Sequence, residues 1–207
     1  PVFLALGNHD DLDSFAEVFG ACGSSADHAT VIEGLHVITL DSHVPQRVHG
    51  DLRQEQLDWL KTELARFPEL PKVVQIHHPP VFGKAEGSPD EWHHLTAQAS
   101  EALRMALSGY RILGLFSGHV HTDQFTLWQG LPCFSSAGLN NTTDATFTGG
   151  LRALRAASFN VCTVSGHDLR VSAVPLLALD DELFILSAEQ LQRFNPTAPS
   201  PSQKENV

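Results

Sequence analysis

The chain has 207 residues, of which 42% are hydrophobic, and this is enough to bury the core of one globular domain. Lys and Arg number 13 against 24 Asp and Glu, and the formal net charge of −11 argues against a nucleic-acid polymer as partner. No stretch approaches the roughly 20 apolar residues of a membrane-spanning helix, so no membrane association is expected.

Short apolar runs alternate with amphipathic segments over the first half of the chain. The apolar runs predict strands at 2–6, 30–32, 36–40, 73–76 and 112–116. Helices are expected at 11–19, from Asp51 to just before Pro68, and at 95–107, with Asp51 interpreted as a helix N-cap. Strand-like runs then follow one another at 124–128, 133–135, 158–164 and 169–175. The pattern therefore changes from alternating strands and helices to consecutive strands.

We expect one domain over residues 1–180, a C-terminal helical segment at 181–194, and a Pro/Ser-rich disordered tail at 195–207. Cys22, Cys133 and Cys162 are odd in number and form no C-x-x-C pair, which disfavours a disulfide framework. A reducing compartment, the cytoplasm, is the expected location.

Polar clusters follow three of the expected strands, at the point where each strand ends. These clusters are G-N-H-D at 7–10, H-H-P-P at 77–80 and G-H-V-H at 118–121. If the three strands lie side by side, their carboxyl ends bring four side chains to one crevice: Asn8, His77, His119 and His121. Imidazole nitrogen and amide oxygen suit zinc, manganese or iron, so the sequence predicts a metal site.

The H-x-H spacing in the third cluster allows a more specific expectation. In an extended segment, alternate side chains project to the same face. His119 and His121 would then bind one metal ion together, or each would bind one of two neighbouring ions.

The three clusters, in this order, resemble the second half of the calcineurin-like metallophosphoesterases. The segment "LDSHVPQRVHGDLRQEQLDWL" at 40–60 and the strand-rich end resemble the bacterial class III cyclic nucleotide phosphodiesterases within that superfamily. The resemblance implies an α/β fold, the four-layer α/β/β/α sandwich. Family members also carry D-x-H and G-D-x-x-D motifs before G-N-H-D. Neither motif is present here, so we expect an N-terminally truncated domain without its first strand–helix–strand unit.

The resemblance also implies a set of metal ligands. The family binds two divalent metal ions, which would be Mn, Fe or Zn. The second ion would be held by Asn8, His77 and His119, and the first by His121.

The remaining implied roles concern the substrate. His9 would contact the scissile phosphate, as a catalytic and substrate-binding residue, and Asp10 would orient His9. His78 would line the substrate pocket. The roles of His43, His49 and the pair at 93–94 stay open, although these histidines lie in segments that border the site in the family.

The function implied is hydrolysis of small phosphodiesters, most of all cyclic nucleotides resembling 3',5'-cAMP, by attack of a metal-bridging hydroxide. Two alternatives remain: a phosphatase or glycerophosphodiesterase on the same scaffold, and a metal-poor domain used for binding. Without the ligands of the absent motifs, the chain alone would have low activity. A homodimer is one arrangement that would cover the sheet edge left open by the absent unit.

Overall fold

The computed structural model describes residues 1–20, 25–83 and 93–192. Its helices are α1 (Leu12–Phe19), α2 (Gln54–Arg66), α3 (Ala97–Leu107) and α4 (Ala188–Gln192). Its strands are β1 (His28–Ile32), β2 (Leu35–Leu40), β3 (Lys72–Ile76), β4 (Ile112–Ser117), β5 (Gln124–Trp128), β6 (Leu131–Ser135), β7 (Thr142–Thr143), β8 (Gly150–Ser165) and β9 (Asp168–Ser187). Cys22 and the expected tail at 195–207 lie outside the described residues.

Six strands form the central sheet, in the order β1-β2-β3-β4-β6-β5. The four inner strands are parallel, and β1 and β5 pair antiparallel with their neighbours. Strands β1 and β2 form a hairpin, with φ of 46° at Glu33 and 82° at Gly34, as a tight two-residue turn requires. Because parallel strands end at the same edge, the residues that follow β2, β3 and β4 meet on one side of the sheet.

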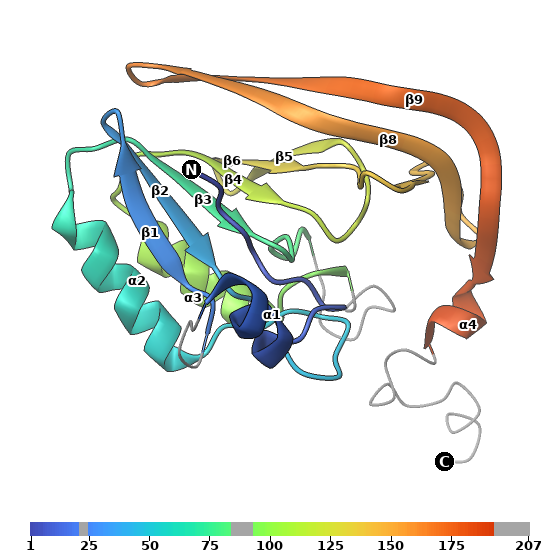
Figure 1. The fold of residues 1–207 in the computed structure, drawn as a ribbon, viewed down its shortest axis with the longest axis horizontal. Coiled ribbons are helices and arrows are strands. Elements are labelled where there is room, and N and C mark those ends of the chain that lie inside the picture. The colour runs from blue at the N-terminus through green and yellow to red at the C-terminus, as the bar shows by residue number, and fades with distance from the viewer. Residues whose placement is uncertain (21–24, 84–92, 193–207) are drawn as a thin grey trace.

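Helices α2 and α3 cover one face of this sheet (Figure 1). One side of α2 is apolar and faces the sheet, and Leu60 and Leu64 are fully buried on it. They pack in one cluster with alternate residues of the sheet, among them Ile38, Val74 and Leu115. This cluster is the core that holds the strand ends in place.

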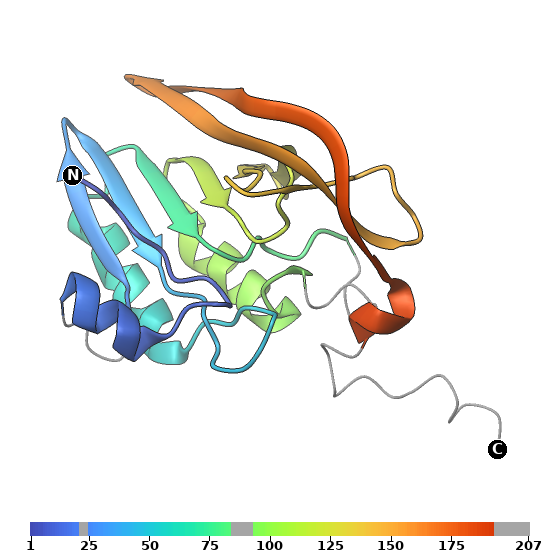
Figure 2. The ribbon, with the colours of Figure 1, turned by 45° about the vertical axis from the view of Figure 1, so that its right-hand side comes forward.

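The second sheet, in the order β7-β8-β9, lies over the opposite face (Figures 1 and 2). Gly114 of β4 faces Leu169 of β9 so closely that a Cβ on Gly114 would lie 3.0 Å from Leu169 Cδ2. Ser158 of β8 donates from Oγ to Oδ2 of Asp123, the residue just before β5, at 2.5 Å. This bond links the two sheets. The α/β fold class is confirmed, and the described residues form a helix–sheet–sheet succession of layers.

The expectation of a strand at 2–6 is wrong. This segment carries no strand hydrogen-bond ladder, although Leu6 is only 1% exposed and Phe3 stacks on His28 of β1 at 5.9 Å between ring centroids. An apolar run predicts burial, whereas a strand also needs a neighbouring strand with free backbone groups. The segment lies beside β1 without joining the sheet, and its burial increases from Val2, which is exposed, to Leu6.

The C-terminal strands are longer than expected. Strand β9 continues through Pro175 to Ser187, so most of the helix expected at 181–194 is strand, and α4 covers only Ala188–Gln192. Proline cannot donate to a ladder, so Pro175 would disfavour continuation of a central strand. It is tolerated because β9 is the edge strand of its sheet and the register shifts next to its partner Ser158.

Asp51 is not the N-cap of α2. The helix begins at Gln54, and the backbone N–H of Arg53 donates to Gln56 Oε1 at 3.0 Å. Asp51 Oδ1 instead accepts from the hydroxyl of Thr96, the N-cap residue of α3, at 2.8 Å. The carboxylate thus ties the segment before α2 to the start of α3.

Candidate metal centre

The three polar clusters meet at the carboxyl edge of the parallel strands. His77 follows β3 directly, and the backbone N–H of Gly118, after β4, donates to the carbonyl of His77 at 3.0 Å. The G-N-H-D segment forms a tight turn in which Asp10 Oδ2 accepts from the N–H of Gly7 at 2.7 Å. A Cβ on Gly7 would lie 2.9 Å from the His77 ring, so only glycine lets this turn approach the histidine so closely.

Asn8 joins two histidines from different strands. Its Oδ1 accepts from His77 Nε2 and from His119 Nδ1, both at 3.1 Å, and the two rings lie 5.1 Å apart between centroids. The two nitrogens therefore point at one oxygen. With each ring proton moved to the other ring nitrogen, His77 Nε2, His119 Nδ1 and Asn8 Oδ1 would present three lone pairs to one small volume, which is the arrangement that a divalent cation needs. The donor set fits the metal site expected from the sequence.

The H-x-H segment is not extended, which corrects the expectation of a shared face. His119 and His121 have φ of 63° and 50°, in the left-handed region that side chains other than glycine seldom adopt. His119 turns toward Asn8, whereas His121 Nδ1 bonds Asn141 Oδ1 at 2.8 Å. Backbone strain of this kind often accompanies functional sites.

His121 nevertheless lies near enough to His77 for its charge to lower the pKa of the His77 ring. Burial, followed in order of importance by the charges of His119, His121, His9 and His43, lowers the pKa of His77 to about 3. The His77 ring is therefore neutral at physiological pH in the metal-free protein, with a lone pair available to a cation.

His78 occupies a different position from its neighbour His77. Its side chain is fully buried, with Nδ1 bonded to Ser42 Oγ at 2.8 Å and Nε2 to the carbonyl of Val48 at 2.9 Å. Together with His77 and His119 it forms a group whose nitrogens all lie within 4.8 Å of one another. The structure thus places His78 behind the crevice.

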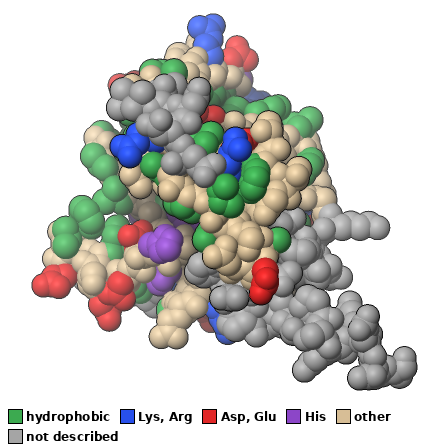
Figure 3. Space-filling model, turned by 90° about the vertical axis from the view of Figure 1, so that its right-hand side faces the viewer, with side chains coloured by type: hydrophobic (Ala, Val, Ile, Leu, Met, Phe, Trp, Pro, Cys, Tyr) green, Lys and Arg blue, Asp and Glu red, His purple; other side chains and the backbone are tan. Residues whose placement is uncertain are grey.

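His9 and Asp10 are exposed at the rim of the site. The Asp10 carboxylate accepts from the backbone of Gly7 and shapes the turn that presents His9. Figure 3 shows histidine side chains surfacing together in a hollow, beside acidic side chains. The rim is therefore open to a ligand from solvent.

Sequence reasoning missed two residues of this region. Ser42 lies just past the end of β2 and bonds His78, so the strand-end rule that found His77 also applies to it. Asn141, which bonds His121, lies in a polar loop before β7 and carries no comparable signal.

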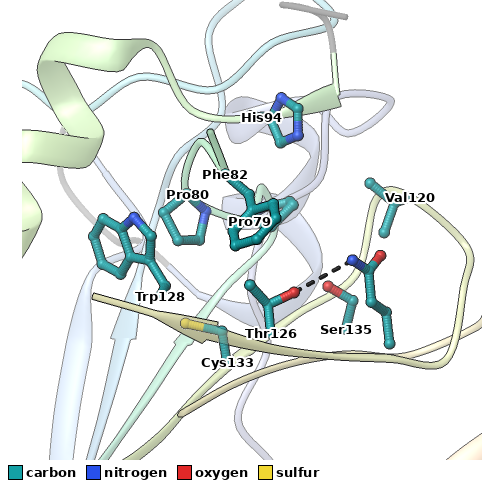
Figure 4. A pocket seen from close by; sticks show the side chains of 10 residues that line it. Pro79, Pro80, Phe82, His94, Val120, Thr126, Trp128, Cys133 and Ser135 are labelled. Atoms are coloured by element: carbon teal, nitrogen blue, oxygen red, sulfur yellow. Dashed lines mark hydrogen bonds between the residues drawn. The ribbon is translucent and has the colours of Figure 1, made fainter. Parts of the chain in front are cut away.

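A small pocket lies behind the H-x-H segment (Figure 4). Val120, between the two histidines, contributes to its wall together with Pro79, Pro80, Trp128 and Cys133. Its volume of about 50 Å³ is well below the roughly 300–1,000 Å³ of a ligand pocket. It has room for a few water molecules.

Comparison with known proteins agrees with this geometry. Residues 1–123 match the calcineurin-like phosphoesterase family, and the chain belongs to that family, whose members generally use divalent metal ions. No helix in the described part of the chain is long and apolar enough to cross a membrane.

Three relatives bear names that describe phosphodiesterases. A "probable cyclic nucleotide phosphodiesterase" of Rhodococcus erythropolis is 31% identical over 84% of this chain and 58% of its own length. A "cAMP/cGMP dual specificity phosphodiesterase" of Mycobacterium tuberculosis is 31% identical over 70% of this chain and 45% of its own. A "probable glycerophosphodiester phosphodiesterase" of Arcobacter nitrofigilis is 31% identical over 66% and 51%. The chain thus spans about half the length of these curated relatives.

Proposed function

We propose that this chain carries one part of the active site of a metal-dependent phosphodiesterase that hydrolyses cyclic nucleotides. The observation that carries the proposal is the convergence of Asn8, His77 and His119 on one point at the carboxyl edge of the sheet. The family and the names of the relatives support the same reaction class.

In this proposal Asn8, His77 and His119 hold one divalent ion, and His121 contributes to a second. When bound, such ions neutralise the phosphate charge and activate water for attack on phosphorus. His121 would exchange its bond to Asn141 for the metal. The left-handed backbone at His119 and His121 lets consecutive ligands turn in different directions, as two separate ions require.

His9 has the position of a group that meets the substrate. It is exposed and stands next to Asn8 on the same turn. Its imidazole is suited to holding a phosphate oxygen or to giving a proton to the leaving oxygen. Asp10 holds this turn through the backbone of Gly7, and in that way keeps His9 at the rim.

Metal binding also accounts for how so acidic a chain handles an anionic substrate. With a formal net charge of −11, the protein repels phosphate diesters unless positive charge is concentrated at the site. Divalent ions held by neutral ligands supply this charge locally.

A second substrate class, glycerophosphodiesters, is favoured by the relative from Arcobacter nitrofigilis. The metal-binding motifs handle the phosphate group and do not contact the leaving group, so they do not discriminate between the two. A metal-poor binding domain remains the third alternative.

A substrate panel tests the proposal. The chain, and a longer version that adds upstream sequence with D-x-H and G-D-x-x-D motifs, would be assayed with Mn²⁺ on 3',5'-cAMP, glycerophosphocholine, p-nitrophenyl phosphate and bis-p-nitrophenyl phosphate. We expect the longer protein to prefer cAMP and the chain alone to turn over poorly, because the additional ligands complete the site. A preference for glycerophosphocholine would select the second class. Absence of turnover by both versions would favour the binding domain.

A further inference from the structure

Both ring nitrogens of His78 make hydrogen bonds within the protein. A carbonyl oxygen only accepts hydrogen bonds, so the contact with Val48 places the ring proton on Nε2. Nδ1 is then the acceptor, and the hydroxyl of Ser42 donates to it. Both nitrogens of the neutral ring are used within the protein, which leaves His78 without a lone pair for a metal ion.

The same ring lies against both proposed histidine ligands. Its centroid is 4.8 Å from that of His77, nearly perpendicular at 88°, and 4.5 Å from that of His119, at 56°. Since His77 and His119 come from different strands, their relative position depends on what packs between and behind them. His78 packs against both rings, in addition to the hydrogen bonds that both make to Asn8.

Backbone groups of the neighbouring segment fix the ring from the other side. A Cβ on Gly50 would collide with the His78 imidazole, so the glycine backbone lies directly against the ring. That backbone is itself held, because the Gly50 N–H donates to the His94 carbonyl at 3.1 Å and the Gly50 carbonyl accepts from the Thr96 N–H at 2.9 Å.

Ser42 is anchored independently of the ring. It is fully buried, and its carbonyl accepts from the N–H of Asp51 at 3.1 Å. Its hydroxyl also accepts from the backbone N–H of His78 at 3.3 Å. Ser42 thus sets both the backbone position and the ring orientation of His78.

We propose that His78, fixed by Ser42 and Val48, is a positioning residue that holds the rings of His77 and His119 in the geometry that binds metal. The inference rests on the proposed metal site. It assigns to His78 a structural contact with the ligands in place of the substrate contact expected from the sequence. Groups that orient metal ligands in this way typically change metal affinity by roughly 10–100-fold when they are removed.

The test measures Mn²⁺ binding to the purified chain, from the loss of the free-ion electron paramagnetic resonance signal. Ser42→Ala removes the donor to His78, and Ser42→Thr retains a hydroxyl at the same position. Ser158→Ala is the matched control, because Ser158 is also a buried serine with one side-chain partner, Asp123, on another part of the fold. His78→Asn, which keeps an acceptor for Ser42 but has no ring, gives a second route if Ser42→Ala does not fold.

We expect Ser42→Ala and His78→Asn each to weaken Mn²⁺ binding about 10-fold or more. Ser42→Thr should bind more tightly than Ser42→Ala, and Ser158→Ala should bind like the original chain. ¹⁵N-histidine spectra of the unmodified protein should show His78 protonated at Nε2. A general loss of stability would not explain unchanged Mn²⁺ binding by Ser158→Ala, nor the position of the ring proton on His78.

Two results separate this inference from the proposed function. If the unmodified chain binds no Mn²⁺, the proposed metal site fails, and the inference fails with it. If the chain binds Mn²⁺ and the folded Ser42 and His78 variants bind it equally well, the metal site stands and the role of His78 is overturned. A His78 ring protonated at Nδ1 would also overturn it.

Discussion

Replacing Asn8 by alanine should loosen the link between β3 and β4 at the site, even without metal. Asn8 Oδ1 accepts two hydrogen bonds of 3.1 Å, from His77 and His119. Each such bond contributes roughly 0.5–1.5 kcal/mol net, so Asn8→Ala should lower the free energy of unfolding by about 1–3 kcal/mol. The upper part of this range applies if the His77 nitrogen, which is buried, finds no water in place of the amide.

Urea denaturation of the metal-free chain measures this change, with Asn141→Ala as the control. Asn141 makes one comparable bond, to His121 Nδ1 at 2.8 Å, so its loss should cost about half as much. In addition, only Asn8→Ala should abolish Mn²⁺ binding at the site formed by Asn8, His77 and His119. An unfolding free energy for Asn8→Ala equal to that of the unmodified chain would refute the view that this amide holds the two rings together.

The other predictions concern single groups of the same region. In the longer protein, His119→Ala should lose bound metal and activity together. His9→Ala should retain bound metal, measured by elemental analysis, and lose turnover of bis-p-nitrophenyl phosphate. A metal-free His9→Ala protein would contradict the role proposed for His9. Burial lowers the pKa of His77 to about 3 and of His78 to about 2, so unfolding takes up two protons below pH 6.5. The unfolding free energy of the metal-free chain should then fall by roughly 3 kcal/mol per pH unit between about pH 5.5 and 3.5, and a flat pH profile in urea titrations would exclude these neutral rings. Gly50→Ala should destabilise the chain by about 1–3 kcal/mol in the same assay, because the added Cβ would overlap the His78 ring. Unchanged stability would mean that the His78 ring does not lie against the backbone of Gly50.

The central features of the site could be predicted from the sequence because they depend on local patterns. Apolar runs that end in polar residues marked the carboxyl ends of β3 and β4, and parallel pairing then brings His77 and His119 together. The same reasoning placed Asn8 correctly, although the segment before it is not a strand. The informative feature was therefore the end of an apolar run, whether or not that run is a strand.

Other features depend on contacts between distant residues and leave no local signal. The two partners of His78 lie 36 and 30 residues away, so its buried position could not be inferred from the H-H-P-P motif. The left-handed backbone at His119 and His121 occurs together with hydrogen bonds of their rings to Asn8 and Asn141, which come from separate loops. The length of β9 depends on its edge position, which makes Pro175 harmless.

The most direct test of the proposed metal centre is an anomalous difference map from a crystal of this protein soaked in Mn²⁺. The account predicts a peak bonded to Asn8 Oδ1, His77 Nε2 and His119 Nδ1, the three atoms that converge in the metal-free protein. His78 should remain bonded to Ser42 and Val48 and outside the coordination sphere. A Mn²⁺ ion bound through His78, or no peak at these three atoms while Mn²⁺ occupies other histidines, would contradict it.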